Sequence, residues 1–144
     1  MKDLDWSNLG FGYRRTDYNV RCYYRDGKWG EIEVCSSEYV NLHMAATCLH
    51  YGQEAFEGLK AFRCPDGKVR VFRMDENAAR LQSTCRGIMM PEVSTELFEE
   101  MVSKVVRLNQ EYIPTYESGA SLYIRPLLIG TSAQVGVHPA TEYV

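Results

Sequence analysis

Residues 49–62 constrain the fold most, because they combine a helical pattern, a glycine stop and a strand pattern in one short stretch. Small and apolar residues recur at helical spacing from just before this stretch onward, namely Ala45, Cys48, Leu49, Gly52, Ala55 and Phe56. Gly58 follows them, and a glycine just past a helix can take the left-handed conformation that closes it. The pattern predicts a helix that ends at Gly58 and leads into a strand.

The residues after Gly58 predict a β-hairpin. Residues 59–64 run as a strand toward a turn signal at Pro65-Asp66-Gly67, and residues 69–73 return as a second strand. The aromatic side chains of residues 49–62 crowd around a backbone that needs glycines. This crowding fits either a tightly packed corner between helix and strand or a wall that approaches a ligand closely.

The N-terminal part predicts another pair of strands. Residues 11–24 are rich in Tyr, Val, Thr and Arg, and residues 29–35 alternate between two faces. Asp26-Gly27 lies between the two runs and is a strong turn signal. A second antiparallel pairing is therefore expected.

Residues 120–130 predict one further strand, whose two faces differ in chemistry. Leu122 and Ile124 share one face, which suits a core covered by helices. Tyr123 and Arg125 share the other face. That pair must therefore face water, a partner or a ligand.

Two longer helices are predicted between these strands. Asp75 can cap a helix over residues 76–86, and Gly87 suits its exit. Ser94 can cap the longest helix, over residues 95 to about 111. The apolar stripe of that helix is expected in the core and consists of Leu97, Met101, Val105, Leu108 and Tyr112, widened by Phe98 and Val102.

These elements predict an α+β fold, a mainly antiparallel β-sheet with about three helices packed on it. A length of 144 residues fits one domain. Residues 142–144 look like the start of a new strand, so we expect the chain to have been cut from a longer protein.

Composition argues against several classes of function. A net charge of −3 and a pI near 5.6 argue against a nucleic-acid binder. No apolar run reaches the length of a membrane span, and the acidic start lacks a secretion signal. The five cysteines include no closely spaced pair, which suits reduced core thiols in the cytoplasm, and the three histidines have no metal-ligand spacing.

Four blocks of sequence occur in an order that is familiar from one enzyme family. The blocks are LHYGQEAFEGLKAF at 49–62, VFR at 71–73 with NAARL at 77–81, GASLYIRP at 119–126, and Gly136-Val137. Over residues 10–144 the chain resembles the small N-terminal domain of branched-chain amino acid aminotransferases, pyridoxal 5′-phosphate (PLP) enzymes of fold type IV. The resemblance implies a small α+β domain over residues 1–134. Residues 135–144 would form the interdomain loop and the start of a missing PLP-binding large domain.

The resemblance also implies an activity for the parent protein. It would be a branched-chain-amino-acid transaminase that moves the amino group of leucine, isoleucine or valine to 2-oxoglutarate through PLP. A homodimer and a cytoplasmic role in branched-chain amino acid biosynthesis are expected. The family's Schiff-base lysine lies in the missing half, because no lysine here matches its position: Lys2, Lys28, Lys60, Lys68 and Lys104. This chain alone is expected to be inactive, with neither a catalytic residue nor a metal site.

Particular residues receive roles from the resemblance. Arg80 matches the arginine that binds the cofactor phosphate, and a guanidinium fork suits phosphate oxygens. The substrate-binding matches are Tyr51 beside the cofactor and the substrate carboxylate, Phe11, Tyr123 and Val137 in the side-chain pocket, and Arg125 at its mouth. Val137 would reach the partner subunit's site, and Arg125 would suit a second carboxylate such as that of glutamate. Phe56 would support the pocket from its helix.

Each of these residues also has an ordinary structural explanation. Arg80 could be a surface helix arginine, Tyr51 a buried tyrosine, Phe11 and Val137 simple packing, and Arg125 one half of a salt bridge on a sheet face.

Other functions stay open at this point. A D-amino acid aminotransferase or an aminodeoxychorismate lyase would share the fold-type IV framework, although residues 57–60 and 121–126 argue against both. A non-catalytic domain that binds a partner through Tyr123 and Arg125 is a third possibility.

Overall fold

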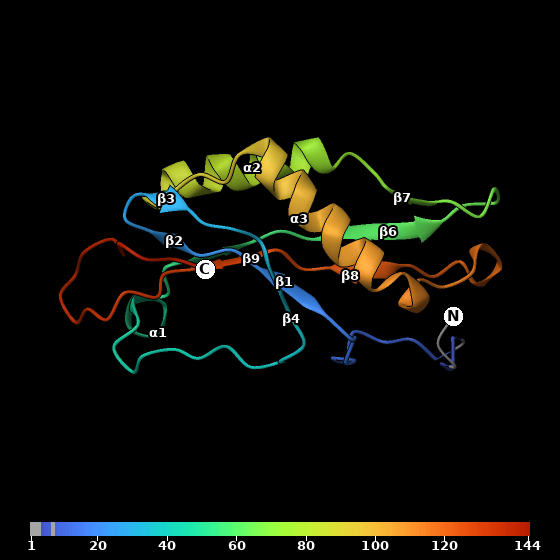
Figure 1. Ribbon diagram of the computed structural model, residues 1–144, viewed down its shortest axis with the longest axis horizontal. Coiled ribbons are helices and arrows are strands. Elements are labelled where there is room, and N and C mark those ends of the chain that lie inside the picture. The colour runs from blue at the N-terminus through green and yellow to red at the C-terminus, as the bar shows by residue number, and fades with distance from the viewer. Residues whose placement is uncertain (1–3, 7) are drawn as a thin grey trace.

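The computed structural model describes residues 4–6 and 8–144 (Figure 1). In chain order, the elements of these residues are β1 (Asn19–Arg21), β2 (Tyr24–Arg25), β3 (Lys28–Trp29), β4 (Glu33–Cys35), α1 (Thr47–Tyr51), β5 (Glu54–Phe56), β6 (Leu59–Arg63), β7 (Val69–Val71), α2 (Met74–Gly87), α3 (Thr95–Leu108), the 3₁₀ helices η1 (Gln110–Tyr112) and η2 (Tyr116–Ser118), β8 (Leu122–Ile124) and β9 (Leu127–Ile129). All strand pairings between these elements are antiparallel. The predicted α+β class with three α-helices is confirmed, although the strands form four small sheets rather than one.

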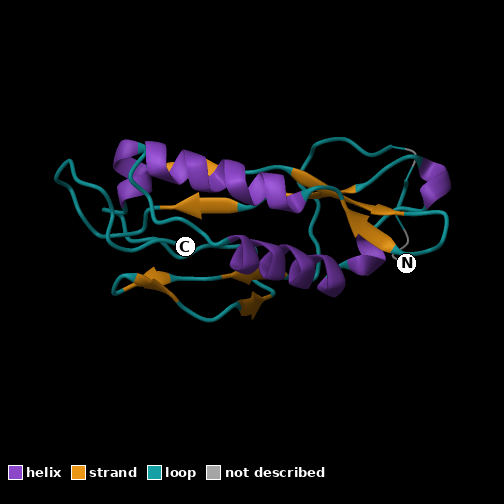
Figure 2. Ribbon diagram, turned by 90° about the horizontal axis from the view of Figure 1, so that it is seen from above, coloured by secondary structure: helices purple, strands orange, loops and turns teal. Residues whose placement is uncertain are grey.

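Helices α2 and α3 cover one face of the strands (Figure 1), and Figure 2 shows the two helices from above. Alternate residues along β5 and β6 point toward these helices and are buried. The core joins residues of both layers: Ala55, Leu59, Ala61, Ile124 and Leu128 from the strands, and Ala78, Leu81, Cys85, Phe98, Val102 and Val106 from the helices. On the opposite strand face, Phe56, Phe62 and Tyr123 are exposed.

The strands under the helices form one long antiparallel ribbon that is interrupted in its middle. One side of the ribbon consists of β5 and β6, and the other consists of β8 and β9. The interruption lies at Glu57-Gly58 on the first side and at Arg125-Pro126 on the second. Pro126 has no N–H to donate to the ladder, but its carbonyl accepts the Glu57 N–H at 3.0 Å. The strand predicted over residues 120–130 is therefore two strands.

The prediction that the first helix ends at Gly58 is wrong. Helix α1 is short and ends at Gly52, which has a φ of 62° and donates its N–H to the Cys48 carbonyl at 3.0 Å. Gly58 instead lies close to the Tyr123 hydroxyl, which would have to move to make room for a Cβ at this position. The chain between the two glycines is strand β5, in which burial alternates from residue to residue.

The hairpin predicted after Gly58 is confirmed as β6 and β7, but the N-terminal strands are shorter than predicted. Residues 11–18 contain no strand, and β1 pairs with β4. β2 and β3 form a separate hairpin across Asp26 and Gly27, whose φ values are 52° and 78°. Both central residues are left-handed, as a tight hairpin turn requires, so the turn prediction is confirmed.

The start of α2 differs from the prediction, whereas its end agrees. The residue before the helix is Arg73, in a left-handed conformation with φ 45°, and Asp75 lies inside the first turn. The Asp75 carboxylate accepts a hydrogen bond from the Arg73 guanidinium at 3.2 Å instead of capping the helix. Gly87 is the last helical residue.

Helix α3 begins as predicted but is rotated relative to the predicted core. The Ser94 hydroxyl accepts a hydrogen bond from the Leu97 N–H at 3.1 Å, which confirms the cap. The helix ends at Leu108, and η1 continues to Tyr112. The fully buried stripe is Phe98, Val102 and Val106, while Leu97, Met101, Val105, Leu108 and Tyr112 are only partly buried. Phe98 and Val102, which were predicted only to widen the stripe, therefore lie at its centre.

We expect Ser94→Ala to lower the free energy of unfolding of the chain by about 1 kcal/mol, because the first turn of α3 loses its capping oxygen. Urea denaturation would measure the change. Ser103→Ala in the middle of α3 is the control, since alanine there improves helix propensity and should not destabilise the chain. Equal stability of Ser94→Ala and the unmodified chain would contradict the capping role.

The five cysteines are all free thiols, and burial raises the pKa of the Cys85 thiol to about 11. No helix within residues 4–6 and 8–144 is long and apolar enough to cross a membrane. The same residues contain no cluster of His, Cys, Asp or Glu side chains that could hold a metal ion.

Candidate functional site

Arg80 on α2 is held by a carboxylate that lies beneath the helix. Glu57 occupies the ribbon interruption, and its side chain is only 3% exposed. The Arg80 Nε donates to Glu57 Oε1 at 2.8 Å, and the Arg80 Nη2 donates to Oε2 at 2.6 Å. Asn77, one turn earlier on α2, donates to the same Oε2 at 2.9 Å. The Arg80 side chain is nevertheless 67% exposed.

This contact fixes the charge state of Glu57. Burial raises the pKa of the Glu57 carboxyl, but hydrogen bonds from Arg80 and Asn77 outweigh burial, so the pKa lies below its ordinary value. Glu57 is therefore an anion at neutral pH. Arg80 is an exposed helix arginine, which agrees with its ordinary structural explanation, but its guanidinium is also oriented by the buried Glu57 carboxylate.

The guanidinium of Arg80 has room for a second anion. Glu57 occupies the edge formed by Nε and Nη2. Among the described residues, no side chain or carbonyl accepts from Nη1 or from the remaining N–H of Nη2. This open edge presents two parallel donors to solvent, which is the geometry that fits two oxygens of a phosphate group.

Tyr123 and Arg125 share the open strand face, as the strand alternation predicts. The Tyr123 hydroxyl accepts hydrogen bonds from Arg125 Nε at 3.1 Å and from Nη2 at 2.9 Å. The guanidinium carbon of Arg125 lies 4.4 Å from the centre of the Phe56 ring. Phe11 contacts Tyr123 edge to face, with ring centres 5.9 Å apart. These four side chains form an aromatic surface with one fixed positive charge, which we call the aromatic–arginine patch.

The positive charge of the patch is not neutralised locally. Within the part of the chain that the structure describes, Arg125 makes no ion pair with a carboxylate. The salt bridge on a sheet face that was considered for Arg125 is therefore not found there. The patch can accept an apolar side chain on its rings and an anionic group at Arg125.

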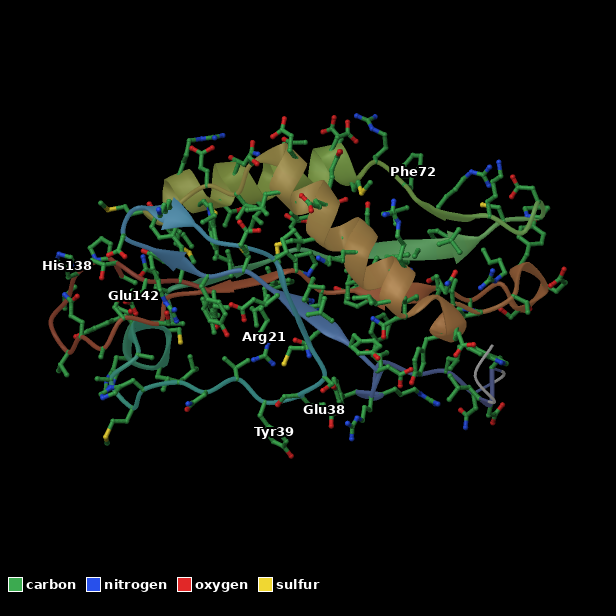
Figure 3. All side chains as sticks on the ribbon, viewed as in Figure 1. Arg21, Glu38, Tyr39, Phe72, His138 and Glu142 are labelled. Carbon is green, nitrogen blue, oxygen red and sulfur yellow. The ribbon has the colours of Figure 1, made fainter. Side chains whose placement is uncertain are left out.

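Tyr51 and Val137 lie together at another place. Helix α1, which carries Tyr51, lies beside the 131–140 loop at one end of the molecule (Figure 1). The Tyr51 hydroxyl donates to the Val135 carbonyl, and Tyr51 is part-exposed rather than a buried core residue. Tyr51 and Val137 line a surface hollow of about 420 Å³. Val137 is 89% exposed, and His138 follows it at the outer end of the loop (Figure 3).

The structure thus distributes the predicted residues over three places. Arg80 stands at the ribbon interruption, Phe11, Tyr123 and Arg125 form the aromatic–arginine patch, and the remaining pair borders the loop hollow. The roles assigned to these residues by resemblance stay predictions.

Sequence reasoning placed one residue on the wrong element and missed two others. Phe56 was predicted on a helix but lies on β5, with its ring beneath Arg125. Glu57 and Asn77 were not singled out. Glu57 is nevertheless the charged member of an alternating buried series that also contains Ala55, Leu59 and Ala61. A charged residue at a buried position of a strand is the signal that could have identified it.

Comparisons with known proteins agree over the whole chain. The chain is 48% identical to the branched-chain-amino-acid aminotransferase of Haemophilus influenzae across all 144 residues, which is 42% of that relative. It is 41% identical to the chloroplastic branched-chain-amino-acid aminotransferase 5 of Arabidopsis thaliana, over 99% of this chain and 34% of the relative. The chain therefore spans about two fifths of the length of the curated relatives that it matches. No protein-family model matches the chain.

Solved structures give the same result. The branched-chain amino acid aminotransferase of Escherichia coli matches 90% of this chain and 39% of its own, with 26% identity and a TM-score of 0.59. A second branched-chain amino acid aminotransferase, solved in complex with N-(5′-phosphopyridoxyl)-L-glutamate, matches 87% of this chain and 39% of its own, with 25% identity and a TM-score of 0.61. Along its full length the chain is therefore homologous to part of the branched-chain-amino-acid aminotransferases, and it shares the α+β fold of the small domain of these fold-type IV enzymes.

Proposed function

We propose that this chain is the small domain of a PLP-dependent branched-chain-amino-acid transaminase, which transfers the amino group of leucine, isoleucine or valine to 2-oxoglutarate. The observation that carries the proposal is the 48% identity with such an enzyme across every residue of the chain. The relatives named above are branched-chain aminotransferases, which favours this reaction over those of D-amino acid aminotransferases and aminodeoxychorismate lyases. The lysine that anchors the cofactor would lie outside this chain.

The residues present fit the cofactor. Arg80 would hold the PLP phosphate, because its open guanidinium edge offers two donors in the plane that phosphate oxygens need. When bound, PLP supplies the carbonyl carbon that receives the amino group and the conjugated ring that accepts electrons. This chain would supply binding and orientation rather than proton transfer.

The aromatic–arginine patch would select the substrates. Phe11 and Tyr123 would contact the aliphatic side chain of leucine, isoleucine or valine and exclude water from it. Arg125 would bind the second carboxylate of glutamate or 2-oxoglutarate, for which the open patch leaves its charge available. Tyr51 would lie beside the substrate carboxylate, and Val137 would reach the site of a partner subunit in a homodimer.

The remaining parts of the proposal concern the whole protein. Residues 1–134 would form the small domain, and residues 135–144 would lead into a PLP-binding large domain. We further propose a homodimer that acts in the cytoplasm in branched-chain amino acid biosynthesis. The match to only 42% of the Haemophilus influenzae enzyme supports a second domain beyond these residues.

The test uses the full-length protein with PLP bound. We expect L-leucine, L-isoleucine and L-valine, added separately, to convert the visible absorbance of the cofactor to that of its amino form, and D-alanine to leave it unchanged. Conversion by D-alanine would assign the protein to a sister family. A full-length protein that binds no cofactor would show a domain that has kept the fold without the chemistry.

A further inference from the structure

We propose that Glu57 is a positioning residue for the cofactor phosphate: it holds the Arg80 guanidinium in the orientation that leaves the Nη1 edge open. The proposal rests on the proposed function, since it deepens the role of Arg80 in PLP binding. It concerns a residue that touches Arg80 rather than the cofactor.

The position of Glu57 is set by the strand layer. Its N–H donates to the Pro126 carbonyl at 3.0 Å across the ribbon interruption. Buried strand residues lie on both sides of it, at Ala55 and Leu59. Its side chain is almost fully buried, so the carboxylate cannot follow a moving partner into solvent.

Two side chains of helix α2 hold the Glu57 carboxylate. Arg80 contacts both carboxylate oxygens, and Asn77 adds a hydrogen bond to Oε2. Asn77 Nδ2 also donates to the Gly58 carbonyl at 3.4 Å, so the same amide ties α2 to the interruption. The carboxylate plane is thereby fixed, and a bidentate partner must lie in that plane.

Arg80 is ordered by this contact before any ligand arrives. A free arginine side chain has several rotatable bonds, and ordering it on binding an anion costs conformational entropy. Because Glu57 already restricts the side chain, a phosphate meets a guanidinium that points one edge outward. Preorganisation of this kind increases affinity without adding a contact to the ligand.

The other ion pair on α2 shows why burial matters. Arg73 pairs with Asp75 and Glu76 at 3.2 and 2.5 Å, but all three side chains are more than half exposed. Exposed pairs of that kind restrict their arginine weakly, because water competes for both partners. Glu57 differs because its side chain is almost fully buried, so water does not compete for it, and Arg80 is the cation with which it pairs.

Repulsion between anions would act in the opposite direction. Glu57 carries a negative charge beside Arg80, and two anions that share one arginine repel each other. If repulsion dominated, removal of Glu57 would strengthen phosphate binding. We expect orientation to dominate, so removal of Glu57 should weaken phosphate binding.

The experiment measures cofactor affinity rather than activity. The full-length apoprotein would be titrated with PLP and, separately, with pyridoxal, which has the same ring but no phosphate. For Glu57→Ala we expect affinity for PLP to fall by about tenfold or more, with affinity for pyridoxal unchanged, because only the phosphate contact depends on the orientation of Arg80. Glu57→Gln should give a smaller loss in the same direction, since its amide can accept from Arg80 Nε but faces Nη2 with a second donor.

The controls separate positioning from folding. Glu76→Ala removes the exposed carboxylate that pairs with Arg73 on the same helix and should leave affinity for both compounds unchanged. In a variant that already carries Arg80→Ala, adding Glu57→Ala should cause no further loss of PLP affinity, whereas a general folding defect would add to it.

Several outcomes would overturn the inference. Unchanged or stronger PLP binding by Glu57→Ala would overturn the inference and leave the proposed function standing. An equal loss of affinity for PLP and pyridoxal would also overturn it. If the unmodified full-length protein bound no PLP, the proposed function would fail, and this inference would fail with it.

Discussion

Replacing Arg80 by alanine in the full-length protein is expected to weaken PLP retention by about a hundredfold, because the phosphate loses a bidentate, charge-assisted contact. The structure supplies the reason for an effect of this size. Arg80 is ordered by Glu57, whose carboxylate Asn77 also holds, before any ligand binds. Equilibrium dialysis followed by the visible absorbance of the retained cofactor would measure the loss.

Two further variants control this prediction. Arg80→Lys keeps the charge but loses the planar fork, so we expect it to recover only part of the affinity. Arg70→Ala removes an arginine of β7 that is also held by a bidentate carboxylate contact, to Asp66 of the β6–β7 turn at 2.8 and 2.7 Å. It should retain PLP like the unmodified protein. Full retention by Arg80→Ala would remove its phosphate role.

The parts of the fold that the sequence predicted correctly depend on local chemistry. The turn at Asp26-Gly27 needs two left-handed residues, and the Ser94 cap needs one oxygen at one position. The face shared by Tyr123 and Arg125 follows from strand alternation alone. Signals of this kind act over a few residues and can be read without knowing what packs against them.

The parts that were predicted wrongly depend on contacts between distant residues. Gly52 and Gly58 are both plausible helix stops in the sequence, but Gly52 takes the left-handed conformation that closes α1, whereas Gly58 lies in the strand layer close to Tyr123 of β8. Pro126 splits the last strand, and the hydrogen bond from Glu57 to its carbonyl shows that the split is matched on the facing strand. A pattern within one segment contains no information about such a match.

The same limit explains what was missed at the site. The sequence assigned residues around Glu57 to a helix, and on a helix the burial of this carboxylate would not follow from its spacing. Once β5 and β6 are known to be strands, Glu57 falls between the buried residues Ala55 and Leu59. The Arg80 guanidinium was singled out by resemblance, but its partner required the strand layer to be placed beneath α2.

The aromatic–arginine patch leads to the second large effect. In the full-length protein, Arg125→Ala is expected to lower kcat/KM for L-glutamate by about a hundredfold, and to change kcat/KM for L-leucine much less. A carboxylate at the patch would lose its charged donor, whereas an aliphatic side chain would still contact the rings of Phe11 and Tyr123. Steady-state kinetics with each amino donor would measure the two constants.

The physical basis of this selectivity is the way in which Arg125 is held. Its guanidinium stacks on Phe56 and donates to the Tyr123 hydroxyl, which positions the charge without neutralising it. Lys60 is the matched control, because it is a cation directly opposite Tyr123 in the β6–β8 pairing. Lys60→Ala should leave the ratio of the two constants unchanged if the orientation of Arg125 matters rather than the total charge of the face. An equal loss for glutamate and leucine in Arg125→Ala would show instead that Arg125 shapes the patch and does not bind the second carboxylate.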